Sequence, residues 1–172
     1  MCTGGCQETT DTDSWPVYNE EGGSCFIAGT RVTMSDGTTK DIEAVAIGDM
    51  LLGENGISNK VLDFERPKLG NRELYSINGG PYFITPAHPL RTTDGWKSIS
   101  ISEIHRENTD LVDELDITEL KIGDELMRAD GSVEVVNSIR GKDDVDDTQL
   151  YNFILNGDHT YYVDGYLTHN EF

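Results

Sequence analysis

A motif that occurs twice constrains the fold of this chain more than any other feature of the sequence. Residues 41–51 read DIEAVAIGDML, and residues 116–126, 75 positions later (116 − 41), read DITELKIGDEL. Two further segments repeat in the same order, because residues 73–77 return at 149–153 and residues 81–84 return at 160–163. Solenoid units run about 20 to 50 residues and need at least three copies. Two long copies instead predict two subdomains related by a pseudo-two-fold axis, with both ends of the repeated region near a common centre.

Short apolar runs between turn signals make these subdomains mostly β. Such runs, rich in β-branched and aromatic side chains, are typical of strands. They cover residues 31–34, 60–64, 74–77, 82–85, 133–139, 150–155 and 160–163. Asp-Gly and Asn-Gly pairs, which favour tight hairpin turns, separate them. We therefore expect an all-β fold. The exception is residues 98–120, where a loose helical stripe fits either one short helix or an acidic surface loop.

The charge balance excludes one class of partner. The chain has 32 acidic and 13 basic side chains, a formal charge of −19, whereas nucleic-acid binders need clustered Lys and Arg to neutralise phosphates. No apolar run approaches the roughly 20 residues that cross a bilayer, and the first residues resemble no signal peptide. We expect a cytoplasmic monomer without nucleic-acid or membrane partners. Residues 103–147, with 15 acidic against 5 basic side chains, are predicted to form a solvated edge or insertion.

The N-terminal region differs in composition from the rest of the chain. Residues 1–24 are rich in Gly, Thr, Asp and Glu and contain no Lys or Arg, so we expect a flexible leader before a folded domain at 25–170 and a short flank at 171–172. The three cysteines are Cys2, Cys6 and Cys25, too few and too early in the chain for a disulfide framework. Cys2 and Cys6 have the spacing of half a zinc site, but no second ligand pair follows.

Four features place chemically useful groups at informative positions. They are Cys25 at the start of the fold, residues 85–88 (TPAH) after a predicted strand, Asp158-His159 in the last hairpin, and His169-Asn170 near the C-terminus. In these features the chain resembles the Hint superfamily of inteins, bacterial intein-like domains and hedgehog autoprocessing domains. Residues 25–32 (CFIAGTRV) resemble the N-terminal splicing block, residues 84–90 (ITPAHPL) the T-x-x-H block, and residues 161–170 the C-terminal block. The resemblance covers 25–170 and implies a horseshoe-like Hint fold with single-turnover self-processing activity.

The chemistry of the residues supports the same roles at the N-terminal end. The Cys25 thiol can attack the carbonyl of Ser24 and exchange an amide for a thioester, since a thiol of pKa about 8.5 is partly thiolate near neutral pH. His88 can protonate the departing amide nitrogen, a gain of about 10²- to 10⁴-fold. Thr85 can donate to the oxyanion, worth about 3 to 4 kcal/mol for one well-placed donor. Taken singly, Cys25 also fits an inert buried thiol, and Thr85 and His88 also fit a plain turn.

Asn170 offers a second reaction at the other end. Its side-chain amide can attack its own carbonyl, form a succinimide and cleave the Asn170–Glu171 bond, while His169 polarises that carbonyl or protonates the leaving amine. The resemblance implies that His159 is a proton relay or a support for the same carbonyl. The alternative for His169 and Asn170 is a frayed tail. We expect His105 to be a surface residue with no role.

Position 171 departs from the splicing pattern. A splicing intein has Cys, Ser or Thr there to receive the acyl group, and the carboxylate of Glu171 cannot form a stable ester. We therefore predict cleavage rather than splicing, with the chain's own flanking peptides as partners and no cofactor.

Three alternatives remain open. In hedgehog-like processing a sterol captures the thioester, and Glu65-Arg66 lies roughly where that family has an activating acid, although no apolar C-terminal extension follows. An inactive Hint relic would serve only as a structural or interaction module. A metal site of Cys25, His88, His159 and His169 is the third, and zinc on the thiolate would then inhibit the chemistry.

Overall fold

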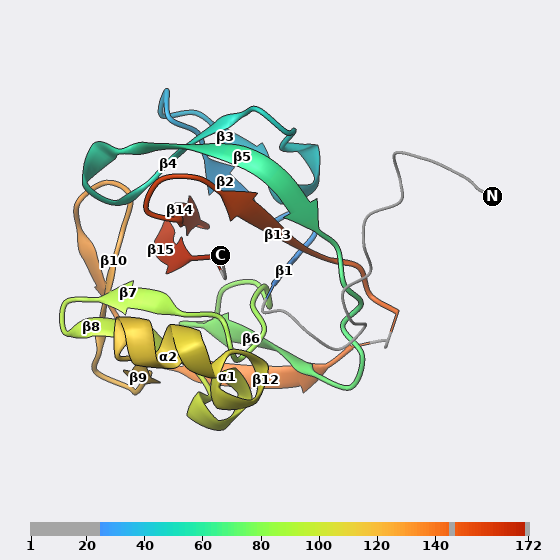
Figure 1. Ribbon diagram of the computed structural model, residues 1–172. Coiled ribbons are helices and arrows are strands. Elements are labelled where there is room, and N and C mark those ends of the chain that lie inside the picture. The colour runs from blue at the N-terminus through green and yellow to red at the C-terminus, as the bar shows by residue number, and fades with distance from the viewer. Residues whose placement is uncertain (1–24, 145–146, 171–172) are drawn as a thin grey trace, which may run out of the picture.

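The described part of the chain, residues 25–144 and 147–170, consists mainly of short strands in this computed structural model (Figure 1). The strands up to the helical segment are β1 (Phe26–Ile27), β2 (Arg31–Thr33), β3 (Thr39–Asp41), β4 (Met50–Leu52), β5 (Ser58–Glu65), β6 (Glu73–Ile77), β7 (Leu90–Thr92) and β8 (Gly95–Ser98). Those after it are β9 (Thr118–Glu119), β10 (Glu125–Met127), β11 (Val133–Val135), β12 (Ile139–Asp143), β13 (Leu150–Leu155), β14 (Thr160–Val163) and β15 (Tyr166–His169). Two 3₁₀ turns, η1 (Ile42–Ala44) and η2 (Glu54–Gly56), flank β4. The predicted all-β class is confirmed.

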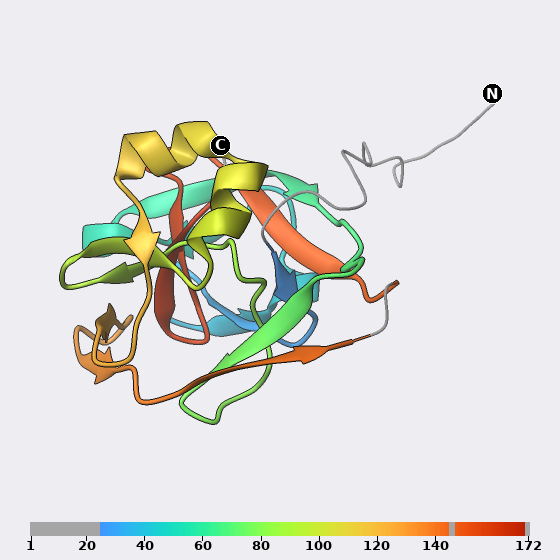
Figure 2. The ribbon, with the colours of Figure 1, turned by 90° about the horizontal axis from the view of Figure 1, so that it is seen from below.

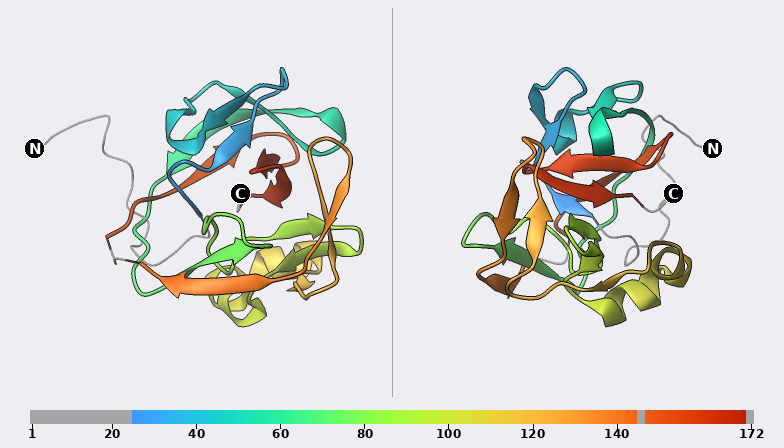
Figure 3. Two further views of the ribbon diagram at one scale, coloured as in Figure 1. Left: turned by 180° about the vertical axis from the view of Figure 1, so that it is seen from behind. Right: turned by 90° about the vertical axis from the view of Figure 1, so that its left-hand side faces the viewer.

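In the described residues the strands form three curled sheets, and the last hairpin belongs to the largest of them. One sheet has the order β1-β13-β5-β4, a second runs β11-β10-β7-β15-β14-β2-β3 with β8 and β9 attached through β7, and β12 pairs with β6. The hairpin of β14 and β15 lies at the centre, with β2 to β5 on one side and β6 to β8 and β12 on the other (Figures 2 and 3). This arrangement is the horseshoe-like architecture expected from the sequence.

The repeated motif adopts the same turn in both copies. The carboxylate of Asp49 accepts a hydrogen bond from the amide three residues before it at 2.9 Å and from Lys40 at 3.0 Å. The carboxylate of Asp124 accepts from the amide three residues before it at 2.7 Å and from Lys97 at 2.9 Å. Burial opposes the ionised form, most strongly at Asp124, but these bonds outweigh it and lower the pKa of both carboxyl groups. Each copy therefore closes with an anchored turn.

The two copies exchange strands with each other. β5 of the first copy pairs antiparallel with β13 of the second, and β12 of the second pairs antiparallel with β6 of the first. Because each copy completes a sheet of the other, neither can bury its apolar strands alone. The exchange carries both ends of the domain toward the middle of the molecule.

Two helices form in residues 98–120, the segment for which the sequence allowed either a short helix or a loop. They are α1 (Ile101–Glu107) and α2 (Thr109–Leu115), inserted between β8 and β9. Ser100 caps α1 and Asn108 caps α2, each by accepting from the amide three residues ahead. Two caps so close together explain why two short helices form where one was considered.

Two predicted strands differ in the structure. Residues 82–85 form only isolated bridges at Ile84, because this segment alternates its hydrogen bonds between β1 and β6 and is bracketed by Pro81 and Pro86, which lack amide donors. The run 133–139 is split into β11 and β12, because the amide of Val136 donates to the carbonyl of Asp124 in the second anchored turn.

The main apolar core lies between the two copies and contains side chains from both. Leu51 of β4 and Leu126 of β10, at matching positions of the repeat, are both fully buried in it. No helix among the described residues has the length and apolar character needed to cross a membrane.

We predict that Leu51→Ala and Leu126→Ala each lower the free energy of unfolding by about 2 to 5 kcal/mol, since each leaves a cavity in the shared core. Urea unfolding followed by tryptophan fluorescence measures the loss. The matched controls are Ile47→Ala and Ile122→Ala, also in the repeat but 55% and 61% exposed, which are expected to change stability by no more than about 0.5 kcal/mol. A large loss for one leucine only would contradict a core built equally from both copies.

Candidate active site

Cys25 is buried at the entrance to the fold. It precedes β1, whose Phe26 pairs with Tyr151 of β13, and its side chain is fully buried in a small cluster with Leu69, Leu74 and Leu150. Phe26 pairs with β13 on one side and bridges to Ile84 on the other, and these pairings fix the backbone next to Cys25. A thiol at this position is therefore held in one place, as the proposed attack on the preceding carbonyl requires.

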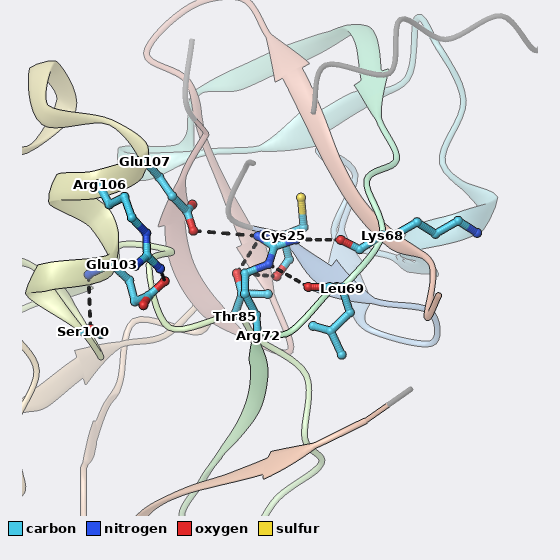
Figure 4. A network of polar contacts seen from close by, with 9 residues as sticks. All are labelled: Cys25, Lys68, Leu69, Arg72, Thr85, Ser100, Glu103, Arg106 and Glu107. Carbon is cyan, nitrogen blue, oxygen red and sulfur yellow. Dashed lines mark hydrogen bonds and ion pairs between the residues drawn. The ribbon is translucent and has the colours of Figure 1, made fainter. Parts of the chain in front are cut away.

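Thr85 holds both backbone groups of Cys25. The amide of Cys25 donates to Thr85 Oγ1 at 3.0 Å, the amide of Thr85 donates to the carbonyl of Cys25 at 3.2 Å, and the Thr85 hydroxyl donates to the same carbonyl at 3.3 Å (Figure 4). The amide nitrogen held in this way is the group that departs when the bond before Cys25 breaks. Thr85 thus lies at the leaving nitrogen, and its donation to the oxyanion stays a prediction.

His88 lies beside the residue that follows Cys25. Its imidazole is fully buried, and its ring centre is 4.3 Å from that of Phe26. Its amide donates to the carbonyl of Thr85 at 3.3 Å, which closes a turn. The plain turn that the sequence allowed for Thr85 and His88 is therefore present, and it brings the His88 imidazole to the start of β1.

Asn170 and His169 are held inside the molecule. Asn170 is 1% exposed, and its amide donates to the carbonyl of His159 at 2.8 Å. His169 Nδ1 lies 2.6 Å from the carbonyl oxygen of Asn170. A carbonyl oxygen can only accept, so Nδ1 carries the proton and donates to this oxygen. The carbonyl belongs to the peptide bond that the proposed cyclisation would cleave. The alternative of a frayed tail is wrong for these two residues.

The surroundings of His169 favour its neutral form. Burial lowers the pKa of His169 below its ordinary value of 6.5, and the neighbouring His159 acts in the same direction, while the hydrogen bond to the Asn170 carbonyl opposes the shift. His159 donates from Nδ1 to the carbonyl of Leu155 at 2.9 Å, and its ring centre lies 5.9 Å from that of His169. The two imidazoles therefore form one group around Asn170.

One short segment, residues 85–90, joins the two halves of the site. Its first residue holds Cys25, as described above. At its other end Leu90 pairs with Thr168 of β15, and the Thr168 hydroxyl donates to the carbonyl of Pro89 at 2.6 Å. The first and last parts of the fold thus contact the same six positions, and His88 lies between the contacts. Sequence reasoning missed Thr168, which has no distinguishing chemistry by itself.

Other predicted positions fall outside this arrangement. Ser24, Glu171, Cys2 and Cys6 lie outside the described residues, together with the leader and the C-terminal flank. His105 is exposed on α1, as expected. Within 25–144 and 147–170, no three His, Cys, Asp or Glu side chains gather as a metal site would require, so the four-residue metal alternative is not assembled.

Sequence reasoning also missed a buried ion pair near Cys25. Arg72 Nη1 lies 3.8 Å from Glu107 Oε2, with side chains only 5% and 7% exposed. Glu107 belongs to the acidic segment that was predicted to be solvated, and for this residue that prediction is wrong. No spacing in the sequence links residues 72 and 107, because the contact depends on how α1 packs.

Comparison with known proteins agrees with the architecture. A family model described as Hom_end-associated Hint matches residues 25–80. Among curated proteins, the catalytic subunit of the V-type proton ATPase of Candida tropicalis is 26% identical over 99 residues, which are 58% of this chain and only 8% of that protein.

Solved structures match over most of the chain. The bacterial intein-like domain from Clostridium thermocellum superposes with a TM-score of 0.62 at 24% identity, covering 85% of this chain and 98% of that one. The gp41-1 intein gives 0.60 at 23% identity, with 86% and 99% covered. A DnaB intein from Synechocystis sp. PCC 6803 gives 0.55 at 16% identity, with 87% and 99% covered. These likenesses show that the chain has the Hint fold of these proteins, and the match of the Hint family model at residues 25–80 agrees with that fold.

Proposed function

We propose that the chain is a self-processing domain that cleaves the peptide bonds before Cys25 and after Asn170, once per molecule. The Hint family match at residues 25–80 and the fold shared with inteins support autoprocessing in general, and the two specific cleavages are our proposal. The substrates are the chain's own flanking segments, and the domain acts as a monomer without a cofactor.

The first step is an exchange of an amide for a thioester. Cys25 Sγ passes its proton to the His88 imidazole and attacks the carbonyl carbon of residue 24, so that a C–S bond forms and a tetrahedral oxyanion develops. The C–N bond then breaks, and the nitrogen of Cys25 leaves as an amine after taking a proton, which His88 delivers. Thr85, bonded to that nitrogen at 3.0 Å, keeps the amide in the orientation from which it departs. Water or an added thiol completes the cleavage.

The second step is cyclisation of Asn170. Its side-chain nitrogen attacks its own carbonyl carbon, a succinimide ring closes, and the bond to residue 171 breaks with a proton passing to the leaving amine. His169 donates to the carbonyl oxygen under attack at 2.6 Å, which stabilises the negative charge that develops there. His159 supports the backbone of Asn170 through its own carbonyl.

One observation carries the proposal. The amide of Cys25 donates to Thr85, while the same 85–90 segment pairs with the strand that ends at Asn170. The thiol of Cys25, the imidazole of His88 and Asn170 are thereby linked through one segment of the fold, which supports the proposal of reactions at both ends.

Glu171 favours separate cleavages over splicing. Splicing would transfer the acyl group from Cys25 to a hydroxyl or thiol at position 171, and a carboxylate there gives no stable ester. We therefore propose that the two ends react independently and that no ligated product forms.

We predict that dithiothreitol or hydroxylamine at pH 8 releases residues 1–24 from the wild-type protein, and that Cys25→Ala abolishes the release. His88→Ala should slow it by about 10²- to 10⁴-fold, because the leaving amine loses its proton donor. Intact-mass spectrometry over time measures each rate.

The control for this experiment is His105→Ala, which removes an exposed imidazole and should leave the rate unchanged. Persistence of the full-length mass in the wild type would instead support the inactive Hint relic.

We predict that the wild type loses residues 171–172 on incubation, that Asn170→Ala prevents the loss, and that His169→Ala slows it by about 10²- to 10⁴-fold. Because burial lowers the pKa of His169, any inflection that this residue imposes on the pH–rate profile should lie below pH 6.5. Mass spectrometry across pH 4.5 to 8.5 locates it, about two units on either side of the ordinary histidine value. An inflection at or above 6.5 that disappears in His169→Ala would contradict the assignment.

We predict that Zn²⁺ slows release of residues 1–24, since zinc binds thiolate and withdraws the nucleophile, and that EDTA alone changes nothing. The C-terminal loss in a Cys25→Ala background serves as the control. Faster release with zinc, or loss of activity with EDTA, would show that the chemistry depends on a metal.

A further inference from the structure

The buried Arg72–Glu107 pair differs from the other ion pairs of the described residues. Burying a charge is costly unless it is paired and hydrogen-bonded, and the other Arg and Lys ion pairs there have cationic side chains between 14% and 69% exposed. Arg72 is 5% exposed, and its contact with Glu107 spans 3.8 Å. A buried pair is often no more stable than apolar side chains of similar volume. Stability alone therefore does not account for this ion pair, and we look to its position near Cys25 for a function.

Backbone carbonyls hold the guanidinium of Arg72 in one orientation. Its Nε donates to the carbonyl of Leu69 at 2.9 Å, and its Nη2 donates to the carbonyl of Lys68 at 2.8 Å. Glu107, at the end of α1, lies on the side of Nη1 (Figure 4). A guanidinium has five N–H donors in a planar fork, so several oxygen atoms can share one such group.

The same loop brings Arg72 to the reacting end of the chain. Leu69, whose carbonyl accepts from Arg72, belongs to the same buried cluster as Cys25. Figure 4 shows the Arg72 guanidinium between Glu107 and the carbonyls of Lys68 and Leu69, with the contacts of Cys25 and Thr85 in the same view. The carbonyl attacked in the first step is bonded directly to the Cys25 nitrogen, about 1.33 Å from it. Its oxygen therefore develops charge next to the amide that Thr85 holds.

We propose that Arg72 is a further catalytic residue of the N-terminal step, in which its guanidinium donates to the oxyanion formed at the carbonyl before Cys25, and that Glu107 is its positioning residue. The inference rests on the proposed function and adds the group that stabilises the negative charge. Arg72 stays protonated throughout, so the proton released by the thiol and the proton taken by the amine are those already assigned.

Thr85, His88 and Arg72 then each act on a different atom of the reacting peptide bond. Thr85 holds the leaving nitrogen, His88 brings its proton, and Arg72 balances the charge on the oxygen. A positive group beside Cys25 also favours the thiolate over the thiol. The negative charge of Glu107 weakens this effect on the Cys25 thiol, and its contact with Arg72 keeps the guanidinium oriented toward the oxyanion. Helix α1, which carries Glu107, thereby takes part in the reaction.

The test compares Arg72→Met, Arg72→Lys and Glu107→Gln with the wild type in thiol-induced release of residues 1–24 across pH 6 to 10, a range that brackets the ordinary thiol pKa of about 8.5. Arg72→Met should slow release by about 10²- to 10³-fold and move the rise of the pH–rate profile to higher pH. Arg72→Lys should keep the profile of the wild type with a smaller loss of rate, and Glu107→Gln should lower the rate less than Arg72→Met.

The matched control is Arg106→Met, which removes a neighbouring guanidinium paired with Glu103 and 69% exposed, and it should release at the wild-type rate. Loss of residues 171–172 reports whether each variant keeps the active fold, and it should be unchanged in all four. Equal slowing at both ends, an unmoved pH profile, or wild-type release by Arg72→Met would overturn the role of Arg72. If Arg72→Met does not fold, an upward-shifted profile for Arg72→Lys overturns it as well. Absence of release from the wild type itself would instead remove the proposed function and this inference together.

Discussion

The site depends on the set of hydrogen bonds between Cys25 and Thr85, which we call the clasp. A peptide bond rearranges only if its nitrogen, its carbonyl and the attacking sulfur are held in a fixed relation. Three hydrogen bonds between these two residues hold the backbone of Cys25 on both sides of its side chain. Because Thr85 also begins the segment that contacts β15, the same clasp fixes the distance between the two ends of the domain.

The exchange of strands between the two copies explains why this clasp can form. If each copy had closed on itself, its ends would lie at its own edge, far from those of the other copy. Instead β13 lies between β1 and β5, and β15 lies between β7 and β14. The pseudo-two-fold arrangement therefore buries both ends at the centre, where a domain normally has only apolar side chains.

Polar groups at that centre are held by backbone as much as by one another. Thr85 binds the backbone of Cys25, which is far from it in the chain, whereas His169 and Arg72 bind backbone carbonyls close to them in the sequence. Such contacts satisfy buried donors and fix their direction. The pKa of His169 is lowered mainly by its burial in this environment. In the proposed chemistry, exclusion of water would set the protonation of this imidazole, and Glu107 is the acidic partner of Arg72.

The sequence by itself determined the fold class and the repeat, and it led us to propose the reactive groups, because turn pairs, strand-like runs and the blocks at 25–32, 84–90 and 161–170 are local patterns. It did not reveal that residues 82–85 divide their hydrogen bonds between two strands, or that α1 would bury Glu107 against Arg72. Those features depend on contacts between segments far apart in the chain, which local preference does not encode. Only the tertiary structure decided which side chains meet Cys25, because the strand exchange sets their neighbours.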